Sequence, residues 1–127
     1  MVVAHASFDL GNYKDAEQAY TQTLALTDKK DKSYVSLTEN LAASVYKQGE
    51  EARVLGDHMT AAGHFLRVAK VAPNSKIRPT AEYDAAASLI LLKAWGRVAV
   101  VLEGFRELYP KHELQKDITK KLAVVYK

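Results

Sequence analysis

The chain has 127 residues, of which 48% are apolar and 26% are charged, so it has the size and composition of one globular domain. Its 18 basic and 15 acidic side chains leave a net charge of +3, which is too small and too dispersed for a nucleic-acid-binding arm. The lack of cysteine excludes disulfides, thiolate nucleophiles and cysteine-built zinc sites, and no apolar run approaches the roughly 20 residues that a membrane-spanning helix needs.

Apolar residues recur at three- and four-residue spacing along most of the chain, and alternation with period two is nearly absent, so we predict an all-α protein. Seven helices follow from this spacing and from the breaks between the periodic segments. They are predicted at 2–10, 13–26, 33–55, 58–71, 79–93, 95–108 and 112–127. The connections are short, so consecutive helices should pack as antiparallel neighbours.

Single residues account for several of these boundaries. Gly11 and Gly56 follow the ends of the first and third predicted helices, as glycine commonly does. Asn12 and Asp57 then offer side-chain oxygens to cap the start of the next helix. Pro79 opens the fifth helix, because a first helical turn leaves its N–H groups unpaired and proline has none.

Three stretches, 10–20, 55–65 and 92–102, align without gaps and share a short turn followed by the start of a helix. Each stretch has a ring, then a compact residue, then a bulky apolar residue: Tyr13, Ala16 and Tyr20, then His58, Ala61 and Phe65, then Trp95, Val98 and Leu102. The compact residues are 45 and 37 positions apart. This regularity indicates an internal repeat of helix pairs.

The pattern resembles the tetratricopeptide repeat, a helix–turn–helix unit of about 34 residues. The segments 11–16 and 56–73 carry the resemblance best, whereas Lys93 and Ala94 stand where the third turn should have Gly-Asp. The resemblance implies an α–α superhelix (a solenoid) of three helix pairs and a further unpaired helix, with a plain helical bundle as the alternative. The units run over about 1–30, 31–74, 75–110 and 111–127, the last one partial, within a single domain.

Small and large side chains alternate as stacked helices require. Small residues that permit close helix approach are Ala16, Gly49, Ala61, Ala86 and Ala123. Large residues that fill the space between helices are Tyr20, Phe65, Leu102 and Phe105.

The last predicted helix has no second helix to complete its unit, so we expect the chain to be a piece of a longer repeat protein. Leu122, Val125 and Tyr126 are predicted to pack on the fifth and sixth helices. The other side of this C-terminal helix should be exposed or should mediate self-association.

No catalytic, cofactor-binding or metal-binding constellation is predicted. Among the four histidines no two stand four residues apart, and His58 and His64 diverge by about 240° around a helix, so we interpret His58 as a packing residue. Glu103 and Glu107 share one helix face, where a solvated surface is expected. No nucleophile elbow or glycine-rich phosphate loop is present, so we expect no enzyme, no cofactor and no metal.

In tetratricopeptide proteins the first helix of each unit lines the concave face, and the resemblance selects three positions in each unit. They are His5, Phe8 and Asp9, then Tyr46, Glu50 and Arg53, then Thr80, Tyr83 and Ala87. Tyrosine and arginine are enriched where proteins bind one another most tightly. The alternative is that Tyr46 and Tyr83 only cover the edge of the core, with their hydroxyls in water.

The resemblance implies a non-catalytic scaffold that binds a protein or peptide segment in its concave groove. A structural spacer or oligomerising part of a larger protein is the alternative. RNA-binding helical repeats are a third class, but their base-reading positions are occupied here by Tyr46, Glu50, Tyr83 and Ala87, which suit protein contacts better. We therefore expect a protein or peptide partner and no nucleic acid.

The segment 73–86 and the end of the sixth helix at 105–110 are similar to tetratricopeptide proteins of the bacterial cell envelope. Those proteins include periplasmic cell-division coordinators and outer-membrane assembly lipoproteins. The similarity implies a role in envelope assembly or cell division, and favours the periplasm or cell envelope over the cytoplasm.

Overall fold

The computed structural model describes residues 11–125, and this part of the chain is all-helical, without strands. Its helices are α2 (Tyr13–Ala25), α3 (Ser33–Val54), α4 (His58–Val71), α5 (Arg78–Leu91), α6 (Trp95–Leu108) and α7 (Gln115–Val125). Each of these helices begins within three residues of the start predicted for it, and the all-α prediction is confirmed for the described residues. The helix predicted at 2–10 lies outside the described residues.

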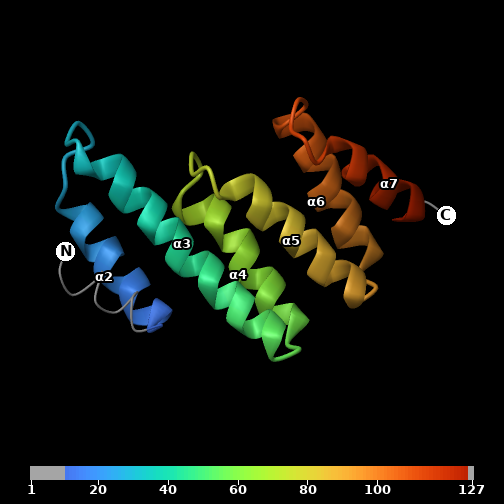
Figure 1. The fold of residues 1–127 in the computed structure, drawn as a ribbon, viewed down its shortest axis with the longest axis horizontal. Coiled ribbons are helices and arrows are strands. Elements are labelled where there is room, and N and C mark those ends of the chain that lie inside the picture. Colours follow the sequence, from blue (N-terminus) through green and yellow to red (C-terminus); the bar gives the residue numbers. More distant parts are fainter. Residues whose placement is uncertain (1–10, 126–127) are drawn as a thin grey trace.

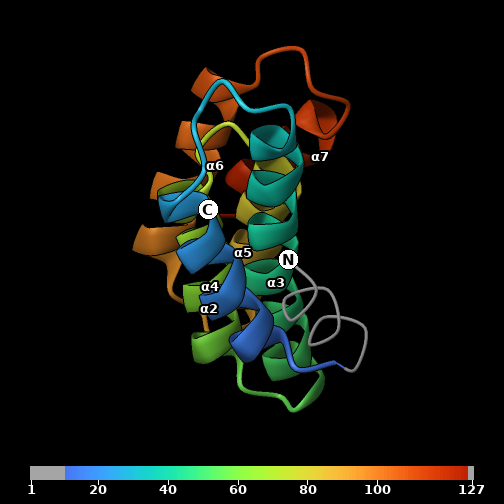
Figure 2. The ribbon, with the colours of Figure 1, turned by 90° about the vertical axis from the view of Figure 1, so that its left-hand side faces the viewer.

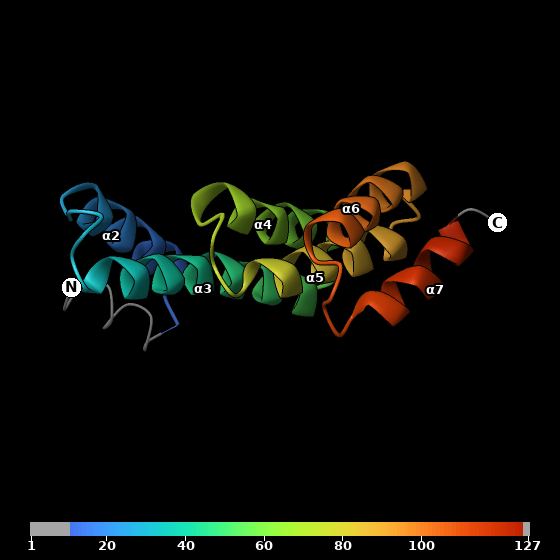
Figure 3. The same ribbon diagram turned by 90° about the horizontal axis from the view of Figure 1, so that it is seen from above.

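The six described helices form a row in which each one packs against the next along the chain (Figure 1). Seen from above, the row has two layers, with α2, α4 and α6 in one and α3, α5 and α7 in the other (Figure 3). The same two layers stand side by side when the row is viewed from the α2 end (Figure 2). This packing of adjacent helices is consistent with a helical repeat.

The turn between α3 and α4 shows why the chain reverses there. Gly56 has φ +81°, a left-handed conformation that glycine adopts without steric cost. Its N–H donates to the Arg53 carbonyl at 3.0 Å, and the Asp57 N–H donates to the Ala52 carbonyl at 2.9 Å, so carbonyls left over at the end of α3 are paired. The Asp57 carboxylate accepts the Thr60 N–H at 3.2 Å, which confirms its predicted capping role.

The predicted side-chain cap at Asn12 is wrong. The Asn12 side chain forms no capping hydrogen bond. Its backbone carbonyl accepts the Ala16 N–H at 3.0 Å, which is the usual first hydrogen bond of a helix and is also present at Asp57. The start of α2 is therefore held by its backbone and by the packing of Ala16 and Tyr20, which are fully or almost fully buried.

The core lies between successive helices rather than at one centre. One cluster joins α3, α4 and α5, a second joins α5, α6 and α7, and a smaller one joins α2 and α3. The predicted small and large positions in α2–α6 are buried. Gly49 shows why a small residue is needed, because a Cβ atom there would lie 2.6 Å from Cε1 of Phe65.

The C-terminal helix packs as predicted on one side. Leu122 is buried and Val125 is half-buried in the cluster formed with α5 and α6, while Tyr126 lies outside the described residues. Ala123 was expected to allow close helix approach but is exposed, because no described helix follows α7 to cover it. Val124 on the same side is 61% exposed.

Candidate functional site

Six of the nine predicted partner-binding residues lie within the described residues. Tyr46, Glu50 and Arg53 belong to α3, and Thr80, Tyr83 and Ala87 belong to α5. These two helices are in the same layer and contact each other (Figure 3). We call this surface the tyrosine face. His5, Phe8 and Asp9 lie outside the described residues.

Tyr46 links α3 to the two helices beside it. Its hydroxyl donates a hydrogen bond to the Asp84 carboxylate on α5. Its ring packs on the Phe65 ring of α4, with the centroids 5.1 Å apart. Burial, followed by the contact with the Asp84 carboxylate, raises the pKa of Tyr46 well above its usual value, so the hydroxyl remains a donor.

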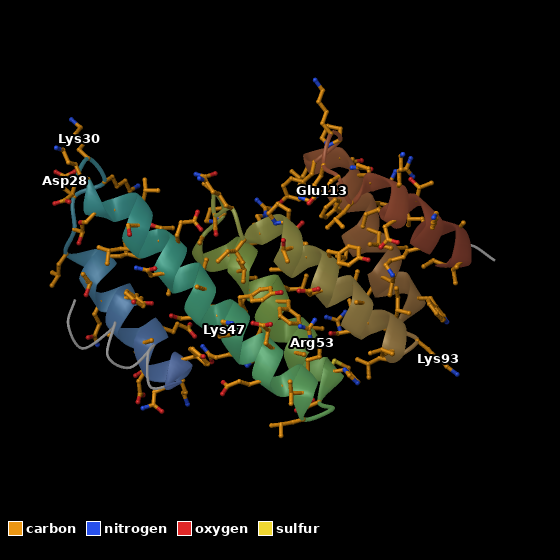
Figure 4. All side chains as sticks on the ribbon, in the orientation of Figure 1. Asp28, Lys30, Lys47, Arg53, Lys93 and Glu113 are labelled. Carbon is orange, nitrogen blue, oxygen red and sulfur yellow. The ribbon has the colours of Figure 1, made fainter. Side chains whose placement is uncertain are left out.

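Arg53 lies beside Tyr46 and shares its carboxylate partner. The guanidinium is 3.6 Å from Asp84 and 3.6 Å from Glu50, and it stands over the Phe65 ring at 5.4 Å from the centroid. Glu50 also pairs with Lys47 at 3.2 Å. Lys47 and Arg53 both project from α3 (Figure 4). The result is a surface of alternating charges around one half-buried tyrosine.

Tyr83 forms a similar link from α5 to α7. Its hydroxyl donates to the Asp117 carboxylate, and the Lys121 ammonium lies 5.4 Å from the centre of its ring. Burial, with Asp117 as the next cause, raises the pKa of Tyr83 to about 12. Both tyrosines therefore connect neighbouring helices of one layer through a carboxylate.

Asp84, Asp117 and Lys121 are parts of this face that the sequence analysis missed. A signal for Asp84 was present, because it lies four residues after Thr80 and three before Ala87, which places it on the same helix face. For Asp117 the helix spacing alone was not enough, since its contact with Tyr83 depends on how far α7 is shifted along α5.

Two open hollows lie on the α3 side of the face. One, of about 320 Å³, lies between α3 and the start of α5, where Thr80 is exposed. The second, of about 460 Å³, lies between the C-terminal half of α3 and the start of α2. Lys47 and Glu50 line both hollows. Ala87, farther along α5, is half-buried and lines neither.

A second polar cluster lies away from this face and connects α2, α3 and α4. The Glu17 carboxylate accepts hydrogen bonds from Arg67 at 2.8 and 3.1 Å and from Gln48 at 2.6 Å. The Arg67 guanidinium holds the pKa of Glu17 below its usual value. His64 Nδ1 is 3.0 Å from Arg67, and burial lowers the pKa of His64. These contacts hold α2, α3 and α4 together, so we interpret the cluster as structural.

The described residues contain no cluster of three or more His, Asp or Glu side chains arranged to hold a metal ion. His58 is half-buried, with Nδ1 unpaired in the described part of the chain, and His112 Nδ1 accepts the Leu114 N–H at 3.1 Å. Within residues 11–125, no helix is both long enough and apolar enough to cross a membrane.

Comparison with known proteins adds no relative. No protein-family model, curated protein or solved structure matches the chain.

Proposed function

We propose that the chain is a tetratricopeptide-like helical repeat whose tyrosine face binds a segment of another protein. The observation that carries this proposal is the hollow of about 320 Å³ between α3 and α5, which has exposed polar and apolar walls beside Tyr46. Grooves between neighbouring helices of one layer are a common place for a helical or extended peptide to dock.

The chemistry of the face suits a segment of mixed character. Positive charge comes from Lys47, Arg53, Lys76 and Lys121, and negative charge from Glu50, Asp84 and Asp117. Because these charges leave an excess of only one positive charge, the face favours no strongly acidic or basic partner. Ile77 and Ala43 add apolar surface inside the hollow, where a partner's apolar side chain would be removed from water.

The repeat interpretation is supported by equivalent packing in two hairpins. Gly49 lies next to Phe65 in α3–α4, and Ala86 and Leu102 are the residues 37 positions later in α5–α6. All four are buried. A role in the bacterial cell envelope is supported only by the resemblance of segments 73–86 and 105–110 to envelope tetratricopeptide proteins, and the cytoplasm is the alternative compartment.

A purely structural role is the second candidate, and a specific observation favours it. Tyr46, Arg53 and Tyr83 already interact with carboxylates of their own chain, so they hold α3, α5 and α7 together without any ligand. In that case the face would only set the spacing of helices in a larger protein.

Blocking the hollow separates the two candidates. Thr80→Arg places a long charged side chain at an exposed position of the hollow and removes no contact between helices. Gln18→Arg adds the same charge at an exposed position of α2, in the other layer, and serves as the control. Cross-linking in cells, followed by mass spectrometry, should show partners that Thr80→Arg loses and Gln18→Arg retains. Identical partner sets, with unchanged helicity, would contradict the binding role.

A further inference from the structure

The outer side of α6 carries an apolar surface that the chain does not cover. Val98, Leu102 and Phe105 are fully buried on its inner side. On the opposite side Gly96, Val100 and Gly104 follow one another at four-residue spacing, and we call them the α6 ridge. Val100 is 74% exposed, and the described helices leave this side of α6 free (Figure 3).

The two glycines of the α6 ridge have no role in packing within the described residues. A Cβ atom at either position would meet no described atom within 4 Å. Glycine inside a helix costs about 1 kcal/mol relative to alanine, so two of them on a free surface weaken α6. Their useful property here is that another helix can approach the backbone closely.

The charges beside the α6 ridge are arranged symmetrically around Val100. Lys93 and Arg97 precede it by seven and three residues, and Glu103 and Glu107 follow it by three and seven. Gly96 and Gly104 are likewise four residues to either side, and Leu92 and Leu108 are eight. Along the row formed by Lys93 in the preceding turn, Arg97, Glu103 and Glu107, the charge is basic before Val100 and acidic after it, so the row is complementary to itself in the antiparallel direction. Arg106 lies outside this row, about 120° around the helix from Val100.

Three of these charges are available for such a contact. Lys93, Arg97 and Glu107 are exposed and form no ion pair with another described residue. Lys93 projects away from the α5–α6 turn (Figure 4). Lys93 has φ +57°, a left-handed conformation that favours glycine, and the corresponding residue of the α3–α4 turn is Gly56. The α5–α6 turn therefore has a lysine at a position where glycine would be less strained.

We propose that the α6 ridge binds the α6 ridge of a second copy of this chain, antiparallel and around a twofold axis next to Val100. In this arrangement Lys93 faces Glu107 of the second copy, and Gly96 faces Gly104 of the second copy. The opposite, parallel arrangement would bring like charges together and is disfavoured. Because α6 and the tyrosine face belong to different layers, the dimer leaves the tyrosine face open to a partner.

The size of the contact sets the expected affinity. One pair of helices of 14 residues forms a small interface, so we expect a weak dimer with a dissociation constant on the order of 10 to 100 µM. Sedimentation equilibrium of the 127-residue chain between about 5 µM and about 1 mM spans this range. A chain that remains monomeric over the whole range overturns the proposal.

Single substitutions locate the interface. Val100→Lys should raise the dissociation constant by about tenfold or more, because it places two positive charges at the twofold axis. Val35→Lys is the matched control, since Val35 is 69% exposed on α3, and it should leave the dimer unchanged. Val124→Lys tests the exposed side of α7 in the same way. A dimer that Val124→Lys or Val35→Lys dissociates and Val100→Lys does not would overturn the proposal.

Charge exchange provides a positive test that does not depend on loss of binding. Lys93→Glu and Glu107→Lys should each weaken the dimer, because both place like charges opposite each other. An equimolar mixture of the two variants restores both opposite-charge pairs and should form a heterodimer of nearly the original affinity. Recovery in the mixture also shows that each variant is folded. If the mixture is no tighter than either variant alone, the antiparallel pairing is wrong.

Discussion

The hairpins α3–α4 and α5–α6 occupy equivalent places in the row but pack with different side chains. In α3–α4 the fully buried Phe65 ring lies against Gly49, where even a methyl group would come within 2.6 Å of the ring. In α5–α6 the residues 37 positions later are Ala86 and Leu102, both fully buried. The hairpin with the larger residue on its second helix, Phe65, has the smaller residue on its first helix, Gly49. The combined volume of each pair therefore matters more than the identity of either residue.

The turns of the two hairpins differ in a similar way. Gly56 and Lys93 both have positive φ, and each turn has the same pair of backbone hydrogen bonds. In the second turn the Lys93 N–H donates to the Ile90 carbonyl and the Ala94 N–H to the Leu89 carbonyl. The backbone geometry is therefore retained when the glycine is lost, at the steric cost of a left-handed lysine.

Shortening the large residue should have the largest effect, and a different one in each hairpin. We expect Phe65→Ala to lower the free energy of unfolding by about 4 kcal/mol and Leu102→Ala by about 3 kcal/mol, because the removed ring leaves the larger cavity. Urea denaturation followed by circular dichroism measures both values. Equal losses, or a larger loss for Leu102→Ala, would show that the α3–α4 core collapses around the missing ring.

Adding a methyl group to the small residue of α3–α4 should also be destabilising. Gly49→Ala gains about 1 kcal/mol of helix propensity, but overpacking against Phe65 costs about 1 to 3 kcal/mol, so we expect a net loss of up to about 2 kcal/mol. Gly63→Ala on α4 is the matched control, because a Cβ atom there meets no described atom within 4 Å, and it should be stabilising.

A double variant tests whether the two hairpins are interchangeable. Adding Phe65→Leu to Gly49→Ala gives α3–α4 the pair found in α5–α6, and the double variant should be more stable than the sum of the single effects by about 1 kcal/mol. Additive effects in the same urea experiment would mean that Gly49 and Phe65 are not coupled.

The order of the described helices, and their bounds to within three residues, could be predicted because they depend on local sequence. Apolar spacing, Asp57 as a cap and Pro79 in the first turn of α5 all act within a few residues. At Asn12 the local pattern was not sufficient, since its side chain forms no capping hydrogen bond although its backbone carbonyl opens α2 as the Asp57 carbonyl opens α4.

The candidate site was only partly predictable, because its contacts cross between helices. The resemblance to tetratricopeptide repeats placed Tyr46 and Tyr83 on one face, but neither it nor helix periodicity gives the relative shift of neighbouring helices. The shift of α7 along α5 brings Asp117 to Tyr83, and the shift of α5 along α3 selects Asp84 as the carboxylate shared by Tyr46 and Arg53. Side chains 34 or 38 residues apart cannot be paired from a single sequence.

Exchanging the turn residues Lys93 and Gly56 should change the free energy of unfolding by a smaller amount, and with opposite sign in the two hairpins. Lys93→Gly removes the left-handed lysine and should raise the free energy of unfolding by about 0.5 to 1 kcal/mol, while Gly56→Lys should lower it by about 1 kcal/mol. Guanidinium denaturation at low micromolar protein measures folding without a contribution from self-association. No gain for Lys93→Gly would mean that the Lys93 side chain makes a compensating contact in the monomer.

The hydroxyls of Tyr46 and Tyr83 should give the smallest effect and one that depends on pH. At pH 8 we expect Tyr83→Phe to lower the free energy of unfolding by about 0.5 to 1 kcal/mol, since the hydrogen bond to Asp117 is lost. The pKa of Tyr83 is raised to about 12 in the folded chain, against about 10 when unfolded, so this contribution is fully present below pH 10 and is lost as the pH rises toward 12. The difference between the original chain and Tyr83→Phe should therefore shrink between pH 8 and pH 11 in urea denaturation.

The corresponding change in α3–α4 extends this test. The pKa of Tyr46 is raised further than that of Tyr83, mainly by burial, so the advantage of the original chain over Tyr46→Phe should persist to a higher pH. Tyr34→Phe is the control, because the Tyr34 hydroxyl donates to no carboxylate in the described residues, and its effect should not follow this pattern. If Tyr46 and Tyr83 lose their contributions to the free energy of unfolding at the same pH, the prediction is wrong and burial does not distinguish the two tyrosines. The two hairpins would then differ only in the packing of the Gly49–Phe65 and Ala86–Leu102 pairs.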